Sequence, residues 1–221
     1  MSISVEVDEP GAPESAGTRV VDGIRDAIIQ GDYAPNQRLI EADLSDTFAA
    51  SRATVRTALL ELANEGLVER LPNKGSRVRA ISLDEAIEIL EVRSGIEELC
   101  AAKTAESITD TEIAEFTRLR VRLLDSVAEG DLAEYARLNR LLDQRIREIS
   151  RHATASDVLA RLHAQSVRHQ FKLWSRVSRA KVSVLEHIAI IDAITARDPE
   201  AAREAVRVHL LSVIEALREL A

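Results

Sequence analysis

The chain has 221 residues, of which 46% are hydrophobic and 30% charged, and its formal net charge is −8. This length suffices for two modest domains, and the charge excludes polyanion binding over the whole surface while allowing a local basic face. A composition rich in Ala, Leu, Glu, Arg and Ile favours helices. A single cysteine, Cys100, excludes an internal disulfide and fits a reducing compartment.

The N-terminal segment predicts neither a signal peptide nor a membrane anchor. Residues 1–17 hold four acidic residues, two prolines and no basic residue, which indicates a disordered acidic tail. The chain contains no run of 18 apolar residues, so no membrane-spanning helix is expected. We therefore expect a cytoplasmic protein with no membrane partner.

Three short helices and a hairpin are predicted after the tail. Apolar residues at helical spacing predict helices over 18–30 and 41–49. A third helix is expected to begin after Ser51 as its N-cap and to stop at Gly66. Alternating apolar residues around a Pro-Asn-Lys-Gly turn predict a β-hairpin over 68–80. This order is the layout of a winged helix-turn-helix.

The rest of the chain predicts helices throughout. Capping boxes begin at Ser82 and Thr109, and Asp131 and Asp198 are further N-cap candidates. These signals predict helices over 83–106, 110–129, 132–150, 156–179, 180–196 and 199–220. The expected fold is therefore mostly α: an N-terminal winged helix-turn-helix DNA-binding domain over 18–80, followed by an all-α six-helix antiparallel bundle over 81–221.

Positive charge is concentrated where a winged helix-turn-helix reads DNA. Residues 51–80 carry six Lys or Arg and three acidic residues, a net charge of +3, whereas residues 1–50 carry a net −7. The second helix of such a pair presents its N-terminal residues to base edges in the major groove. The expected DNA-binding residues lie on this helix and on the hairpin: Ser51, Arg52, Thr54, Arg56, Lys74, Gly75 and Arg77.

Each of these residue types suits its place. Arg52 and Arg56 are one helical turn apart, and Arg is the commonest bidentate partner of guanine. Ser51 and Thr54 can donate to phosphates, and Gly75 lets the hairpin backbone approach the sugar-phosphate chain. The alternative interpretation is that these are ordinary solvated residues on a small helical subdomain.

A second constellation lies in the C-terminal helices. His187 and His209 flank the helix break at Asp198-Pro199, each about 15–17 Å from it, so an antiparallel hairpin brings the two imidazoles level. Asn139 and Asp143 share one face of another helix. Two histidines and a carboxylate inside a bundle suit Zn²⁺ or Ni²⁺. The alternative is a pair of histidines satisfied by hydrogen bonds in a polar pocket.

The stretch "IRDAIIQGDYAPNQRLIEADLSDTFAASRATVRTALLELANEGLVERLPNKGSRV" resembles the DNA-binding domain of GntR-type bacterial transcriptional regulators. The family pattern is matched at Pro35, Leu39, Leu44, Ser51, Arg52, Val55, Arg56, Ala58, Leu59, Gly66, Leu67 and Val68. Departures are Asn36 for Gly, Ser45 for Ala, Thr54 for Pro and Thr57 for the usual Glu. The resemblance implies a homodimer that reads a palindromic double-stranded DNA operator.

The C-terminal helices resemble the FCD effector domain of the FadR-like subfamily of these regulators. The pattern is matched in register at Glu186-His187, Ala193-Ile194, Asp198, Ala202 and His209. Asn139 stands where the family has Asp or Asn, whereas Asp143 stands where it usually has His. The resemblance implies a divalent metal ion of the Zn or Ni type, held by Asn139, Asp143, His187 and His209. Because Asp143 replaces the usual His, the affinity for the metal should be lower, and the sequence does not decide whether the site holds a metal.

Arg93 falls where this family often places a pocket arginine. Beside a metal, a fixed guanidinium would hold a small carboxylate bidentately, whereas the alternative is a surface ion pair with Glu97 at i+4. We therefore expect a homodimeric, sequence-specific transcriptional regulator whose helical domain senses a small carboxylate effector. The competing class is a metal-dependent helical-bundle enzyme with an appended DNA-binding module. Against it, the sequence offers no spare general base, Gly-rich phosphate loop or Ser-His-Asp spacing.

Overall fold

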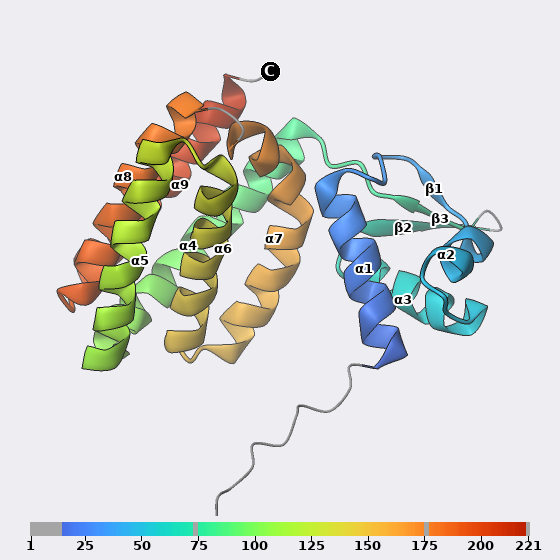
Figure 1. Cartoon of the computed structure of the whole chain (residues 1–221), viewed down its shortest axis with the longest axis horizontal. Coiled ribbons are helices and arrows are strands. Elements are labelled where there is room, and N and C mark those ends of the chain that lie inside the picture. The colour runs from blue at the N-terminus through green and yellow to red at the C-terminus, as the bar shows by residue number, and fades with distance from the viewer. Residues whose placement is uncertain (1–14, 73–74, 175–176, 220–221) are drawn as a thin grey trace, which may run out of the picture. The chain divides into compact units, whose positions relative to one another are not determined.

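The computed structural model describes residues 15–72, 75–174 and 177–219, shown in Figure 1. These residues are mostly helical, as the sequence predicted. The chain divides into two compact units between Arg79 and Ala80. We call them the winged-helix unit and the helical unit.

The winged-helix unit contains α1 (Ala16–Gln30), β1 (Arg38–Leu39), α2 (Glu41–Thr47), α3 (Arg52–Asn64), β2 (Val68–Leu71) and β3 (Gly75–Val78). Helix α1 begins earlier than predicted because the Ser15 hydroxyl accepts a hydrogen bond from the Thr18 amide and caps it. Ala16 and Gly17, assigned above to the disordered tail, are therefore helical. The remainder of that predicted tail, 1–14, lies outside the described residues.

The predicted hairpin is part of a three-stranded antiparallel sheet with strand order β1-β3-β2. Val68 pairs with Val78 in the hairpin, and Arg38 of β1 pairs with Arg77 of β3. Strand β1 was not predicted because two residues are too few to show an alternating pattern. The extra strand brings a third segment of the chain to the predicted DNA-binding hairpin.

The core of the winged-helix unit lies between α1 and α3. Both helices bury apolar residues at helical spacing: Val20, Val21, Ile24 and Ile28 on α1, and Val55, Ala58, Leu59 and Leu62 on α3. Gly23 permits Phe48 to pack against α1, since a Cβ at that position would lie 2.5 Å from the Phe48 ring. Packing one face of α3 in this way directs the opposite face, including Arg52 and Arg56, to the surface.

The helical unit contains α4 (Leu83–Ser107), α5 (Asp110–Glu129), α6 (Leu132–Ile149), α7 (Ala153–Trp174), α8 (Val177–Thr195) and α9 (Pro199–Arg218). The predicted N-caps Ser82, Thr109, Asp131 and Asp198 are confirmed, and Thr109 forms a complete capping box. The predicted boundary between 179 and 180 is wrong, because α8 already begins at Val177. Neither Gly nor Pro marks this break, so the sequence carried no signal for its position.

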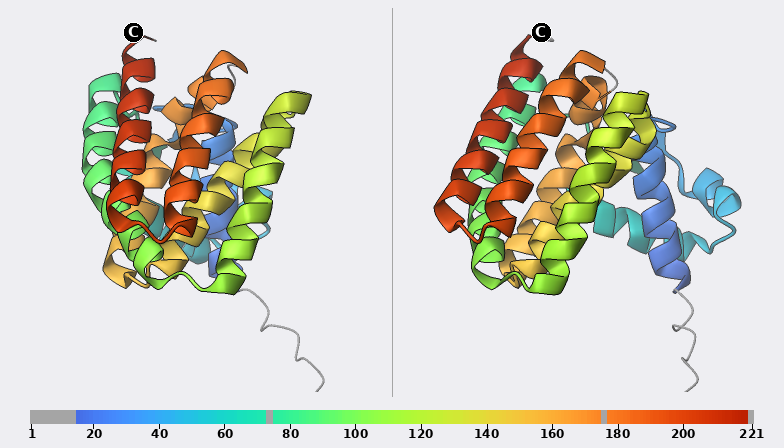
Figure 2. Two further views of the ribbon diagram at one scale, coloured as in Figure 1. Left: turned by 90° about the vertical axis from the view of Figure 1, so that its left-hand side faces the viewer. Right: turned by 60° about the vertical axis from the view of Figure 1, so that its left-hand side comes forward.

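The six helices of this unit pack side by side, as the views in Figure 2 show. Helix α9 lies between α4 and α8, α8 contacts α5, α5 contacts α6, and α6 and α7 contact α4. The core is formed mainly by Phe116, Leu123, Leu138, Leu142, Ile191, Ile194 and Leu210, all fully buried. Cys100 is 1% exposed and lies in this core as a small apolar residue. No described helix combines the length and apolar character needed to cross a bilayer.

Candidate nucleic-acid interface and ligand cavity

Helix α3 begins with a side-chain cap. The Ser51 hydroxyl accepts a hydrogen bond from the Thr54 amide at 3.1 Å and lies 2.9 Å from the Thr54 hydroxyl. The cap fixes the start of α3, and a helix N-terminus of this kind attracts phosphate oxygens. Ser51 and Thr54 thus stabilise the start of the helix, in addition to their predicted role as hydrogen-bond donors to DNA phosphates.

Arg52 and Arg56 lie on the exposed side of α3, and neither is tucked into the interior. Arg56 forms a forked pair with Glu41 at the start of α2, with N–O distances of 3.1 and 2.8 Å. The hydrogen bond to Glu41 raises the pKa of Arg56, and the hydrogen bond from Arg56 lowers the pKa of Glu41. The sequence did not reveal this partner, 15 residues away. Glu41 would compete with DNA for the Arg56 guanidinium.

The hairpin carries a second group of basic residues. Gly75 has a φ of +80°, a left-handed conformation that explains a glycine at this position. Arg77 contacts Glu69 of β2 at 2.6 Å and is directly opposite Arg38 of β1, so the three side chains share one face of the sheet. Arg38 is a basic residue that the sequence did not single out. Lys74, predicted to contact DNA, lies outside the described residues.

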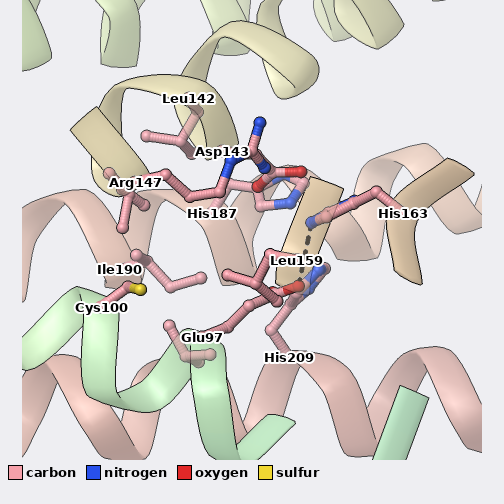
Figure 3. Close-up of a pocket in the computed structure, with 12 residues that line it drawn as sticks. Glu97, Cys100, Leu142, Asp143, Arg147, Leu159, His163, His187, Ile190 and His209 are labelled. Carbon is pink, nitrogen blue, oxygen red and sulfur yellow. Dashed lines mark ion pairs between the residues drawn. The ribbon is translucent and has the colours of Figure 1, made fainter. Parts of the chain in front are cut away.

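The helical unit contains two small cavities that share three wall residues, Glu97, Asp143 and His209. Each has a volume of about 20 Å³, close to that of one water-sized sphere. Figure 3 shows the larger group of wall residues, which come from α4, α6, α7, α8 and α9. All five residues predicted for metal and effector binding line these cavities: Arg93, Asn139, Asp143, His187 and His209.

The two imidazoles lie together, as the antiparallel spacing predicted. Their ring centroids are 4.5 Å apart. Nδ1 of His187 lies 3.1 Å from the Tyr135 hydroxyl, and Nδ1 of His209 donates to Glu186 at 2.7 Å. Burial and the neighbouring His209 lower the pKa of His187 well below its usual range, so this ring is neutral near pH 7.

An outer network fixes His209. Glu186 also accepts two hydrogen bonds from Arg179, at 3.1 and 2.9 Å. Burial alone would raise the pKa of Glu186, but the hydrogen bonds from His209 and Arg179 lower it to about 2. An ionised carboxylate bonded to the outer nitrogen of a histidine is the usual support of a metal-ligating imidazole.

Asn139 and Asp143 bring oxygen donors to the same place. Asn139 is 5% exposed, and its Oδ1 has no hydrogen-bond partner within the described part of the chain. A buried amide oxygen of this kind is costly unless a ligand satisfies it. Burial raises the pKa of Asp143, because a carboxylate loses its hydration there. A cation or a hydrogen-bond donor would stabilise both side chains.

Arg93 is paired with Glu97, but the pair lies in the interior, not on the surface as the alternative above supposed. The Arg93 side chain is 3% exposed, and its Nε and Nη2 each lie 2.8 Å from Glu97 Oε1. His163 of α7 approaches the same oxygen at 3.2 Å through Nε2. Burial would raise the pKa of Glu97, but Arg93 and His163 lower it below its usual range.

The donor types of Asn139, Asp143, His187 and His209 fit a transition metal, although these side chains do not surround a common coordination point. No three His, Cys, Asp or Glu residues in the described ranges are arranged to hold a metal ion. The outer hydrogen bonds of both imidazoles use Nδ1 and leave Nε2 of each ring for a ligand. The unsatisfied oxygen of Asn139 is a further donor. Metal binding by these four residues stays a prediction.

His163 was not singled out from the sequence. It lies one helical turn after Leu159, which lines the same cavity, so the i, i+4 spacing with a core leucine was the signal available. Glu97 had been considered only as a surface partner of Arg93. Tyr135 gave no sequence signal as a histidine partner, because 52 residues separate it from His187.

A winged-helix unit with an exposed basic helix start, joined to a separate all-helical unit, is the organisation of a two-unit DNA-binding regulator. The FCD domain family matches residues 88–212, and the family of bacterial regulatory proteins called gntR matches residues 16–78. The chain belongs to the GntR family of bacterial regulators and carries an FCD domain.

Curated relatives agree with this assignment. The chain is 26% identical over 197 residues to the HTH-type transcriptional repressor RspR of Escherichia coli, covering 89% of this chain and 86% of that protein. It is 25% identical over 213 residues to the HTH-type transcriptional repressor GlaR of the same species, covering 89% and 93%. The family and these relatives identify the chain as a transcriptional regulator and not the metal-dependent enzyme considered above.

Solved structures share the fold. Escherichia coli McbR/YncC matches with a TM-score of 0.81 at 21% identity, covering 94% of this chain and 99% of that chain. A GntR protein from Rhodococcus sp. RHA1 matches with a TM-score of 0.74, also at 21% identity, covering 94% and 100%. Both similarities extend over the two units, each of which therefore has the fold of its family counterpart.

Proposed function

We propose that this regulator binds a palindromic operator as a homodimer and responds to a small carboxylate held in the helical unit, with a divalent metal at the same cavity. The observation that carries the DNA-binding part is the exposed Arg52 at the capped start of α3. An arginine there can reach guanine while the helix end binds phosphate. Contact with chromosomal DNA requires the cytoplasm, which is where we place the protein.

Dimerisation follows from the way a single recognition helix reads DNA. One helix contacts only a few base pairs, so two copies related by two-fold symmetry read half-sites about one helical turn apart. The helical unit offers apolar surface for a second copy: Val182 and Leu185 on α8 are 50% and 65% exposed, and Leu211 on α9 is 46% exposed. Light scattering should then give a mass near twice the 24.3 kDa of one chain.

Selection of genomic DNA fragments by the purified wild-type protein tests the DNA-binding proposal. We expect enrichment of a palindromic sequence, with binding that weakens as salt rises because phosphate contacts release counterions. Uniform recovery of all fragments would contradict the proposal. The genes beside the enriched sequence would also indicate the chemistry of the effector.

The metal would be held by Asn139, Asp143, His187 and His209, and Zn²⁺ or Ni²⁺ suits this donor set. A metal in this place would supply a fixed positive charge for an anionic ligand. Replacing both histidines by alanine should reduce the bound metal, measured by elemental analysis after dialysis against Zn²⁺, from about one ion per chain to background. His152→Ala is the control, since that histidine caps α7 outside the cavity. Unchanged metal content in the double variant would place the metal elsewhere.

The effector would bind beside Arg93, whose guanidinium can hold a carboxylate through two hydrogen bonds. To regulate, the ligand must bind the operator-competent and operator-incompetent states with unequal affinity. A panel of hydroxy and keto acids should therefore include one that raises the melting temperature and changes operator affinity together. Arg93→Ala should weaken this response more than it weakens DNA binding. Equal losses would make Arg93 a purely structural residue.

A further inference from the structure

The cavity wall of the helical unit already contains a carboxylate in contact with the arginine proposed to bind the effector. Glu97 lines both cavities, and its Oε1 lies 2.8 Å from Nε and from Nη2 of Arg93. The same oxygen lies 3.2 Å from Nε2 of His163, the ion pair marked in Figure 3. One carboxylate oxygen is thus close to side-chain nitrogens from two helices, α4 and α7.

We propose that Glu97 is an internal substitute for the effector, and that the effector carboxylate binds by displacing the Glu97 carboxylate from Arg93 and His163. The inference rests on the proposed function, because it concerns how the same cavity takes a carboxylate ligand. It assigns two further specificity-determining residues: Glu97 as the competitor and His163 as the second recognition group.

The burial of Arg93 requires such a substitute. Its side chain is 3% exposed, and a guanidinium in the interior is strongly destabilising without an anionic partner. Glu97 supplies the partner from the next turn of the same helix. A ligand carboxylate of similar shape can replace it without leaving the arginine unpaired, provided that Glu97 moves away.

The contact with Arg93 identifies Glu97 as the competitor. Oε1 of Glu97 lies 2.8 Å from two nitrogens of Arg93, and this arginine helps to hold the pKa of Glu97 below its usual range in spite of its burial, so the carboxylate is ionised. An ionised carboxylate competes directly with a ligand anion. Besides Arg147 and the charged and histidine residues already named, the wall is apolar and suits a short hydrocarbon body: Cys100, Leu142, Ile146, Leu159, Ile190 and Val206.

Displacement of Glu97 can also influence the winged-helix unit through helix α4. Glu97 is on α4, and its contact with His163 ties that helix to α7. Helix α4 begins at Leu83, only a few residues after the winged-helix unit ends at Arg79. Exchange of the internal carboxylate for a ligand would break one α4–α7 contact and so change the helix that leads directly from the DNA-binding unit.

The test removes the Glu97 carboxylate by mutation and supplies a free carboxylate, acetate, in solution. Glu97→Ala deletes a CH₂–COO⁻ group, which sodium acetate matches in size and charge. Acetate should raise the melting temperature of the variant by several degrees in a dose-dependent manner, while equal sodium chloride does not. Wild-type protein and Glu98→Ala should not respond, since Glu98 bonds to Ser94 and is not part of the cavity wall. An acetate response no larger in Glu97→Ala than in Glu98→Ala would overturn the proposal.

A second variant keeps the test valid if the alanine variant does not fold. Glu97→Gln retains the volume of the side chain and removes its charge. By calorimetry it should bind acetate at least tenfold more tightly than wild type, because the internal competitor is weaker. Equal or weaker binding would contradict displacement. Failure of the wild-type protein to select an operator would instead contradict the proposed DNA-binding function, and it would leave the acetate result unaffected.

Discussion

In the winged-helix unit the paired arginine of α3 lies at the surface, whereas in the helical unit a paired arginine lies in the interior. Arg56 is 62% exposed although it is paired with Glu41, while Arg93 is 3% exposed in its pair with Glu97. Both pairs have a closest N–O distance of 2.8 Å, whereas their surroundings differ. A solvated pair contributes little to stability, whereas a buried pair whose partner is removed leaves a charge without water.

This difference separates two ways of serving a ligand. The surface arginines can exchange an intramolecular carboxylate for DNA at small cost, because water stabilises every intermediate arrangement. The buried arginine can exchange its carboxylate only for another anion of similar shape. We therefore expect substitution of the buried charged residues of the helical unit to affect folding first, and substitution of the exposed arginines of α3 to affect binding alone.

The largest effect is expected from Arg93→Ala. The variant leaves the ionised Glu97 buried without its main partner, and we expect the free energy of unfolding to fall by about 3–5 kcal/mol. Chemical denaturation followed by circular dichroism measures this change. Arg137→Ala is the control, because its pair with Glu134 is exposed and its loss should be barely measurable. Similar losses in the two variants would erase the contrast between interior and surface.

Glu97→Gln should cost less, on the order of 2 kcal/mol at pH 7, because one charge-assisted hydrogen-bond set is weakened while volume is kept. The pKa of Glu97 in the folded protein lies below its usual 4.5. Its ionised form thus contributes stability above pH 4.5, and this contribution is lost as the pH falls below that value. Melting temperatures from pH 7 to pH 3 should show the difference between wild type and variant shrinking with acid. A constant difference would contradict the assigned charge state.

Arg52→Ala should reduce operator affinity about tenfold to a hundredfold, the loss of 1–3 kcal/mol expected for one bidentate base contact. Its free energy of unfolding should not change, since the side chain is exposed. Fluorescence anisotropy with operator and scrambled DNA measures both affinity and preference. Arg118→Ala, an exposed arginine of the helical unit, serves as the control. Retained operator preference in Arg52→Ala would remove the basis for the assigned DNA contact.

The smallest effect is expected from Glu41→Gln. The change weakens the competitor for Arg56, so operator affinity should rise about twofold to fivefold with little change in stability. Anisotropy at two salt concentrations should show this gain shrinking as salt rises. Glu61→Gln, an exposed acidic residue of α3, is the matched control. Weaker binding by Glu41→Gln would mean that Glu41 holds Arg56 in its binding orientation.

Prediction from sequence worked best where local signals mark an element. Ser51, Thr109 and Asp198 identified helix starts because a cap satisfies amides within one turn. It did not locate β1, where two residues carry no period, or the start of α8, which has no Gly or Pro before it. The predicted cavity residues do line the cavities. Helical spacing across the break at Asp198-Pro199 fixed the level of His187 and His209, whereas the family resemblance indicated Arg93, Asn139 and Asp143.

The sequence by itself determined the helices, the exposed basic start of α3 and the pairing of His187 with His209, because each depends on local periodicity or a short antiparallel connection. The tertiary structure alone decided that Arg93 is buried, that His163 approaches Glu97 from another helix, and that Glu41 meets Arg56. These contacts join residues whose separation along the chain has no fixed relation to their distance in space. Burial then sets their charge and energy, which residue identity leaves undetermined.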